Sequence, residues 1–263
     1  MKKSKQHNTN YKGISHLESY ILKIITENNL ILFGVEEIIR LTNWDRQRIY
    51  NVLHSLQKKN HIYRIKRNQY VLTENLKEKI FRIATEIIEP SYISFWTALS
   101  YYGYTEQQIK TIQLVTTKQN QSISLSSFTI EPTTFHTKRF FGYKKINDFV
   151  IATPEKAFID LLYQLHKCGG LDEYCKCLKN AWDELNKKTF VQGLLLFDNK
   201  SMISRIGFII DYLCLKKTVD IKKLKTNISQ TPIILNPYGS KKATYNKKWN
   251  LLINHQIKME EIK

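Results

Sequence analysis

Three cysteines and a histidine lie close together in the sequence and are the side chains best suited to hold a metal ion. They are His166, Cys168, Cys175 and Cys177, and imidazole and thiolate groups are the usual protein ligands of zinc. The stretch 171–185 has helical periodicity, so Cys175 and Cys177 are expected to point about 200° apart and cannot share an ion. The chain also lacks a C-x2-C pair and is too long to need disulfides. We therefore predict no metal site, and reduced cysteines in a cytoplasmic protein.

The acidic residues lack the spacing that metal-assisted phosphoryl transfer requires. A nucleotidyltransferase needs paired carboxylates near a Gly-Ser turn, where they hold Mg²⁺. Gly239 and Ser240 are adjacent, but no D-x-D or D-x-E follows them, and the E-x-K pattern of a nuclease occurs only at 261–263. The P-loop, G-x-S-x-G and H-E-x-x-H motifs are missing as well. The sequence therefore predicts no enzyme and no cofactor, and a nucleic-acid-processing enzyme with scattered acids is the less favoured alternative.

The charge of the chain indicates an anionic partner. The net charge is +18, from 41 Lys+Arg against 23 Asp+Glu, and such an excess favours nucleic acid, an anionic membrane surface or an acidic protein as partner. The excess is +7 over residues 1–75, +3 over 76–150, zero over 151–215 and +8 over 216–263. No apolar run approaches the roughly 18–20 residues that span a bilayer, so no segment is expected to cross a membrane. Because +7 of the charge lies in the N-terminal part, where a DNA-binding motif is predicted below, we expect duplex DNA as the partner and no membrane.

Three short helices and a hairpin are predicted in the basic N-terminal part. Ser15 begins a capping box at the start of the first helix. A second helix is predicted over 35–41, and Asp45 is a good N-cap for a third. Two β-prone runs within 61–72 then flank a basic turn, where Asn68 accepts the left-handed conformation. This order of elements is typical of a winged helix-turn-helix domain.

The third helix is the candidate recognition helix. Its apolar residues at 49, 52, 53 and 56 predict a buried stripe with a polar face opposite it. Arg pairs well with guanine, Gln and Asn pair with adenine, and basic side chains of a wing reach phosphates. The residues that we expect to contact duplex DNA are Arg46, Gln47, Arg48, Tyr50, Asn51 and Lys58 of the helix and Arg64, Lys66 and Arg67 of the wing. A merely solvated polar face is the alternative.

The rest of the chain predicts an α+β protein of two domains. Strands are expected at 112–116, 122–130 and 149–152, and helices at 76–88, 94–102, 153–165, 171–185, 189–197 and 200–215. The expected organisation is a disordered basic arm at 1–14, a winged helix-turn-helix domain at 15–75, a connector helix at 76–90 and a mixed α/β C-terminal domain at 91–263. From residue 216 onward we expect an irregular basic tail.

Two features of the C-terminal domain are candidate sites. Asp160 is a carboxylate on a helix otherwise rich in apolar residues, and a buried Asp requires a partner such as Arg or a backbone amide. A structural ion pair is the favoured interpretation of Asp160, and catalysis is the alternative. A basic stretch around Phe140 and Phe141 forms either a solvated loop, which we favour, or a second anion-binding surface. Its members are His136, Lys138, Arg139, Lys144 and Lys145.

Four ordered segments of the C-terminal domain resemble the AbiEi-type antitoxins of the abortive-infection, type IV toxin–antitoxin systems of bacteria. The segments are Tyr92–Gly103, Val115–Lys118, Phe140–Tyr143 and Ile151–Tyr163. Together with the predicted winged helix, the resemblance extends over roughly residues 15 to 215. One departure lies in the wing, where the family often has Gly and this chain has Asn68, which also accepts the turn.

The resemblance implies an antitoxin that also represses transcription of its own operon. The N-terminal domain of such proteins binds inverted repeats in the promoter, which implies two copies of a monomer or weak dimer on each operator. The C-terminal domain counteracts a co-encoded nucleotidyltransferase-like toxin, in many cases without a stable complex. The implied biological role is phage defence by abortive infection. A DNA-binding regulator without antitoxin activity is the alternative.

Overall fold

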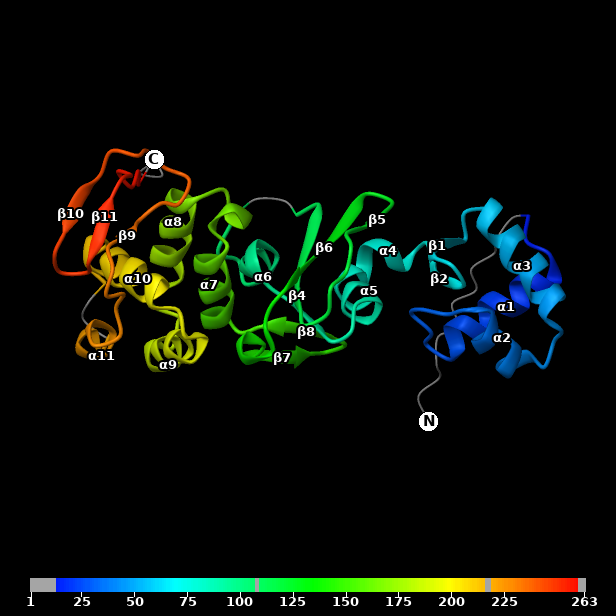
Figure 1. The fold of residues 1–263 in the computed structure, drawn as a ribbon. Helices are drawn as coiled ribbons and strands as arrows, with labels where there is room; N and C mark the ends of the chain where they lie inside the picture. Colours follow the sequence, from blue (N-terminus) through cyan, green and yellow to red (C-terminus); the bar gives the residue numbers. More distant parts are fainter. Residues whose placement is uncertain (1–12, 107–108, 216–218, 260–263) are drawn as a thin grey trace. The chain divides into compact units, whose positions relative to one another are not determined.

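The computed structural model describes residues 13–106, 109–215 and 219–259 (Figure 1). The fold is mixed α+β, as the sequence predicts. The chain divides into two compact units, the first ending at Ile87 and the second beginning at Ile88. This division falls inside the stretch that was expected to be a connector. In the described ranges, no helix is both long and apolar enough to cross a membrane.

The first unit begins with three helices and an antiparallel hairpin, and two further helices complete it. The first five elements are α1 (His16–Glu27), α2 (Val35–Thr42), α3 (Arg46–Lys58), β1 (Ile62–Lys66) and β2 (Gln69–Leu72). Ser15 and Glu18 form the predicted capping box at the start of α1. At the start of α3, Asp45 Oδ1 accepts a hydrogen bond from the Arg48 N–H at 2.8 Å. Both predicted helix starts are therefore confirmed, because each cap satisfies amides that the helix leaves without a partner.

One apolar cluster holds the helices and the hairpin together. The α3 residues Ile49, Val52, Leu53 and Leu56 are buried, as the predicted stripe requires. They share the cluster with Ile21, Leu22, Ile25, Phe33, Val35, Ile38, Ile62, Tyr70 and Leu72. Phe33 also forms an isolated antiparallel bridge with Tyr70, so the segment before α2 lies along β2. At roughly 1.5–3 kcal/mol for each large side chain that is fully buried, this cluster is a main source of stability for the unit.

The single helix predicted over 76–88 is divided in two. The helix α4 (Asn75–Glu78) ends at Lys79, whose φ of −115° and ψ of 23° leave the helical region, and α5 (Ile80–Ile87) follows directly. The prediction was wrong at Lys79 because the apolar periodicity continues across the break. Leu76, Ile80 and Ile83 are all buried and keep helical spacing on both sides of it.

The second unit is built on a six-stranded mixed sheet. Its strands are β3 (Ser91–Ile93), β4 (Thr111–Thr116), β5 (Ile123–Leu125), β6 (Phe128–Thr134), β7 (Tyr143–Ile146) and β8 (Phe149–Ala152), in the order β5-β6-β4-β3-β8-β7. The pairs β4–β6 and β3–β8 are parallel, and the other neighbouring pairs are antiparallel. The single strand expected over 122–130 is instead a hairpin. Ser126 has a φ of 51° and turns the chain between β5 and β6.

Helices pack against this sheet and against one another. They are α6 (Phe95–Tyr101), α7 (Pro154–Tyr163), α8 (Leu171–Ala181), α9 (Lys187–Phe197) and α10 (Lys200–Tyr212), with short 3₁₀ turns at Thr137–Arg139 and Leu165–Cys168. The helix α6 contacts β4 and α7, and α7 contacts β8, α8 and α9. Thr153 caps α7 by accepting a hydrogen bond from the Lys156 N–H at 3.3 Å, and Pro154 occupies the first turn. The predicted start of α7 is therefore confirmed.

The segment after residue 216 was expected to be irregular, and that expectation was wrong. Its described part contains α11 (Ile221–Lys225), β9 (Ile233–Ile234), β10 (Thr244–Asn246) and β11 (Leu251–Ile253), and the strands form a small sheet in the order β10-β11-β9 (Figure 1). Trp249 is fully buried, and its Nε1 donates to Asp211 Oδ2 at 2.8 Å. The indole packs directly on the α10 backbone, since a Cβ added at Gly207 would lie 2.2 Å from it. These strands have only two or three residues each, too few for an alternation of apolar and polar residues to be recognised in the sequence.

Candidate nucleic-acid interface

The polar face of α3 is exposed to solvent. The buried stripe of Ile49, Leu53 and Leu56 sets the rotation of the helix, so the residues opposite it point outward. All of the α3 residues predicted to contact DNA are exposed, namely Arg46, Gln47, Arg48, Tyr50, Asn51 and Lys58. The helix therefore presents amide, phenol and cationic groups, which are the groups that read base edges and contact phosphates.

Arg46 is held by contacts within the first unit. Its guanidinium forms an ion pair with Glu36 of α2. Hydrogen bonds to Glu36 and to Tyr50 raise the pKa of Arg46 above its usual value, so the side chain carries its full charge. The sequence predicted Arg46 as a base contact. In the structure, such a contact requires the guanidinium to exchange Glu36 for a base edge.

Two further pairs orient the N-terminal half of α3. The Arg48 guanidinium lies over the Trp44 ring, 4.0 Å from the ring centroid, in a cation–π contact. Gln47 Nε2 donates to Asn51 Oδ1 at 3.1 Å, one helical turn apart. These contacts reduce the number of rotamers that the three polar side chains sample in the free protein.

The turn of the β1–β2 hairpin is attached to α2. Asn68 has a φ of 55°, the left-handed conformation predicted for it. Its Oδ1 accepts a hydrogen bond from the Val35 N–H at 2.9 Å and so caps the first turn of α2. Gly34 leaves room for this approach, because a Cβ there would lie 2.5 Å from the Asn68 carbonyl oxygen. The predicted DNA contacts Arg64, Lys66 and Arg67 surround this turn and are exposed.

A concavity of about 380 Å³ lies between α3 and the hairpin. Its lining residues are Tyr50, Asn51, His54, Gln57, Arg64, Arg67, Asn68 and Tyr70. The structure thus brings four of the predicted contacts to one place, two from the helix and two from the hairpin. The other predicted contacts, Arg46, Gln47, Arg48, Lys58 and Lys66, are exposed but do not line this concavity.

His54 and Gln57 are not among the residues predicted to contact DNA. Both line the concavity, together with Tyr50 of the same helix. These three residues are spaced i, i+4 and i+7, which places them along one side of α3. The sequence therefore shows that these residues share one side of α3. It does not show that the hairpin lies on that side, which is what makes them line the concavity.

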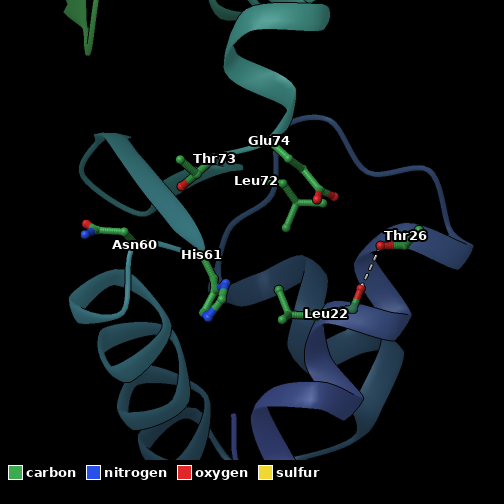
Figure 2. A pocket seen from close by; sticks show the side chains of 7 residues that line it. All are labelled: Leu22, Thr26, Asn60, His61, Leu72, Thr73 and Glu74. Atoms are coloured by element: carbon green, nitrogen blue, oxygen red, sulfur yellow. Dashed lines mark hydrogen bonds between the residues drawn. The ribbon is translucent and has the colours of Figure 1, made fainter. Parts of the chain in front are cut away.

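A smaller cavity lies at the other end of the hairpin (Figure 2). It has a volume of about 200 Å³ and is lined by Leu22, Thr26, Asn60, His61, Leu72, Thr73 and Glu74. Thr26 Oγ1 is turned back to the Leu22 carbonyl at 2.9 Å, as Figure 2 shows. Leu72 is the last residue of β2, whereas the basic turn comes directly before the first residue of that strand. The cavity therefore lies at the opposite end of the strand from the turn and is separate from the concavity beside α3.

Asp160 of the second unit is fully buried and paired. Its carboxylate forms an ion pair with Lys156, one turn earlier on α7, and accepts hydrogen bonds from Ser94 Oγ at 2.7 Å and Tyr92 OH at 3.2 Å. The predicted ion pair of Asp160 is present, with a lysine as the partner. Burial raises the pKa of Asp160 and lowers the pKa of Lys156, while each charge partly offsets the effect on the other.

Aromatic rings enclose the Lys156 ammonium. The nitrogen lies 4.8–5.4 Å from the ring centroids of Tyr92, Phe135, Phe141 and Phe197. Gly142 passes directly over the lysine stem, and a Cβ there would lie 3.0 Å from the Lys156 Cβ. The segment Phe140–Tyr143 therefore closes over the ion pair and removes it from solvent.

None of the basic candidates of the second unit forms an ion pair with Asp160 in the described residues, although Arg139 lies over the same Phe197 ring as Lys156 and its charge lowers the pKa of Lys156. Lys138 and Arg139 line a surface cavity, whereas Lys144 and Lys145 belong to β7 and are exposed. The Lys144 ammonium lies 5.8 Å from the Tyr102 ring centroid. Asp160 has no exposed surface, so its carboxylate cannot touch a ligand on that surface.

The cysteine cluster is buried in the second unit. Cys168, Cys175 and Cys177 have almost no exposed surface. Burial raises the pKa of Cys168 and of Cys177 to about 12, which favours the protonated thiol. Since the thiolate is the form that binds metals and reacts, these side chains have the chemistry of small apolar groups.

Comparisons with known proteins identify a fold but no family. No protein-family model matches this chain, and no curated protein matches it. Among solved structures, it is similar to the RV2827C protein from Mycobacterium tuberculosis, with a TM-score of 0.65 and 10% sequence identity, over 91% of this chain and 92% of that chain. At this identity the similarity concerns the mixed α+β fold alone.

Proposed function

We propose that the first unit is a winged helix-turn-helix domain that binds duplex DNA, with α3 as recognition helix and the β1–β2 hairpin as wing. The observation that carries the proposal is the concavity between the two, where Tyr50, Asn51, Arg64 and Arg67 meet. A helix supplies base-reading groups from one side, and the hairpin supplies phosphate-binding cations from the other. The net charge of +7 over residues 1–75 supports an anionic partner for this unit.

Binding to DNA from upstream of the protein's own gene tests the role of Arg46. Arg46→Ala is expected to weaken binding by about 1–3 kcal/mol if Arg46 reads a base. Glu36→Gln removes the competing carboxylate and is expected to strengthen binding, but only while Arg46 is present. Fluorescence anisotropy of the two single variants and the double variant measures this coupling. If both single variants bind the operator with the affinity of the wild type, Arg46 does not contact the DNA.

Lys66 has a different expected signature, because it is proposed to contact phosphate. Lys66→Ala should weaken binding to operator and random DNA alike and reduce the slope of log K against log salt by about 1. Lys23→Ala on α1 is the control, since it removes an exposed positive charge that belongs neither to α3 nor to the hairpin. Equal effects of the two variants would indicate general charge attraction instead of a docked wing.

We further propose that the protein is an antitoxin and autorepressor of a type IV toxin–antitoxin operon. The support is the resemblance of the ordered segments in the second unit to the AbiEi-type antitoxins, combined with the DNA-binding proposal for the first unit. The partner is then a co-encoded nucleotidyltransferase-like toxin, counteracted without a stable complex. Two copies of a monomer or weak dimer would occupy each operator.

Co-expression with the neighbouring gene tests the antitoxin role. The toxin candidate is expressed from an unrelated promoter, so that repression and antitoxicity are separated. The double variant Arg46→Ala, Lys66→Ala is expected to be impaired in DNA binding. Growth rescue by the full chain that is retained in this variant supports an antitoxin function of the second unit. Absence of rescue favours the alternative of a DNA-binding regulator without antitoxin activity.

A further inference from the structure

We infer that the second unit binds a phosphate monoester in a surface cavity between the 3₁₀ turn Thr137–Arg139 and the C-terminal end of α9. The cavity has a volume of about 590 Å³. Its lining residues are His136, Lys138, Arg139, Leu196, Phe197 and Asp198. Two of these side chains, Lys138 and Arg139, are cationic, and His136 lies two residues before Lys138 in the sequence.

Arg139 is fixed in place by neutral groups. Its Nε donates to the Phe197 carbonyl at 3.2 Å and its Nη1 donates to Tyr163 OH at 3.0 Å. The guanidinium carbon also lies 4.9 Å from the Tyr163 ring centroid and 4.8 Å from that of Phe197. Among the described residues no carboxylate forms an ion pair with Arg139, although Asp198 lines the same cavity. A guanidinium held in this way has lost its rotamer freedom before binding and keeps N–H groups for an anion.

Two neighbours complete the set of donors. His136 Nδ1 accepts a hydrogen bond from the Lys138 N–H at 3.3 Å, so its proton is on Nε2 in the neutral ring, and Nε2 is a donor. The Lys138 side chain is exposed, and within the described part of the chain it forms no ion pair. An ammonium, an imidazole N–H and a guanidinium at one cavity match the several oxygens of a phosphate monoester dianion.

The size and wall of the cavity favour a phosphate that is attached to an organic group. Inorganic phosphate fills only a small part of a volume in the range of small-molecule sites, about 300–1,000 Å³. Leu196 is 59% exposed and supplies an apolar wall beside the cations. A mononucleotide has this combination of phosphate and flat apolar ring, so adenosine monophosphate is a suitable probe.

Asp198 allows a test in which a substitution is expected to strengthen binding. It lines the same cavity at the C-terminal end of α9, where its carboxylate repels an incoming anion. Asp198→Asn removes this repulsion and preserves the shape of the side chain. Asn also tolerates the left-handed conformation of this position, φ 54°. The variant is therefore expected to bind the phosphate more tightly than the natural chain.

Isothermal titration calorimetry of the full chain with adenosine monophosphate, inorganic phosphate and adenosine tests the proposal. We expect saturable binding of the nucleotide, competition by inorganic phosphate and no binding of adenosine. Lys138→Ala should weaken nucleotide binding by about threefold to tenfold and Arg139→Lys by more, while Asp198→Asn strengthens it. Lys179→Ala, an exposed lysine of α8 outside the cavity, should leave binding unchanged.

Three results overturn the proposal. They are absence of saturable nucleotide binding, adenosine binding as tight as that of the nucleotide, and affinity unchanged in both Lys138→Ala and Asp198→Asn. Lys138 and Asp198 are exposed, so these two variants remain informative if Arg139→Lys unfolds the end of α9. All of the variants lie in the second unit, so operator binding by α3 and the hairpin fails or succeeds independently of this test.

Discussion

Glu18 is a single side chain that serves two helices. Its carboxylate accepts a hydrogen bond from the Ser15 N–H at 2.6 Å, which completes the cap of α1, and another from Lys59 Nζ at 2.8 Å just after α3. Burial by itself raises the pKa of Glu18, but the hydrogen bonds from Lys59, Ser55 and Ser15 outweigh it and lower the pKa from 4.5 to about 2. The ionised form is thus tied to the native fold.

The lowered pKa of Glu18 predicts a specific loss of stability in acid. A carboxyl whose pKa falls on folding stabilises the protein fully above its unfolded value, near 4.5, and loses this contribution as the pH drops toward 2. The contribution is on the order of 3 kcal/mol at neutral pH. Glu18→Gln should therefore lower the free energy of unfolding at pH 7 and flatten its decline between pH 5 and pH 2.5 in urea titrations.

Glu27→Gln is the control for this measurement, because Glu27 lies on the same helix and is mostly exposed. It should leave both the stability and its pH dependence nearly unchanged. The same acid profile for wild type and Glu18→Gln would contradict the assignment.

The Lys156–Asp160 pair predicts strong non-additivity between two substitutions. Asp160→Ala leaves a buried, uncompensated ammonium and should cost about 3–5 kcal/mol of unfolding free energy. The double variant Lys156→Met, Asp160→Leu replaces both charges by apolar groups and should be more stable than Asp160→Ala alone. Denaturant unfolding of the double variant and of the two single variants Lys156→Met and Asp160→Leu measures the coupling energy. Additive losses would show that the two charges act independently.

At the scale of elements, the sequence predicts best where a helix has a cap and a long apolar stripe. α1, α3 and α7 begin at their predicted caps, because cap and stripe are local signals. It fails where the outcome depends on partners far along the chain. β3 becomes a strand by pairing with β4 and β8, and in the small sheet after residue 230 β9 pairs with β11, beside which Trp249 packs on α10.

The candidate DNA interface shows the same division. The exposed face of α3 follows from its own periodicity, so its residues could be predicted one by one. The ion pair of Arg46 with Glu36 joins two helices, and the concavity joins a helix to a hairpin, so neither has a local signature. The cavity at Arg139 depends on the meeting of a 3₁₀ turn with the end of α9, which only the fold reveals.

The attachment of the hairpin turn to α2 is a testable element-level feature. Asn68→Gly keeps the left-handed turn but removes the cap on the Val35 N–H, and should cost about 0.5–1.5 kcal/mol. Asn68→Ala removes the cap and also strains the backbone, which adds about 1–2 kcal/mol. Urea unfolding of the two variants separates the cost of losing the cap from the cost of the backbone strain. Equal stability of the Gly and Ala variants would contradict a left-handed Asn68.

At the scale of the whole molecule, each unit has its own apolar core. The core of the first unit is the cluster around Leu53, and that of the second includes Phe158, Tyr174 and Ile206, which are fully buried. Charge is divided as well, since the neutral stretch 151–215 contains most of the helices that form the second core. The two proposed ligands, DNA and a phosphate monoester, are assigned to different units.

Separate cores predict separate unfolding. Leu53→Ala creates a cavity in the first core and should destabilise that unit by about 2–5 kcal/mol. In calorimetry of the full chain, one transition should move to a lower temperature while the other stays in place. Ile206→Ala should move the other transition instead. If Leu53→Ala shifted all of the heat absorption together, the units would be one cooperative block.

The side-chain cap by Asn68 has a consequence for the thermodynamics of recognition. A basic loop that is loose in the free protein must be immobilised on DNA, and each residue so ordered costs roughly 1–2 kcal/mol in backbone entropy. Here the hairpin turn is already fastened to the amide of Val35 before any ligand arrives. The Val35 amide should therefore exchange with deuterium slowly in the free protein and at nearly the same rate in the DNA complex, the signature of a preorganised surface.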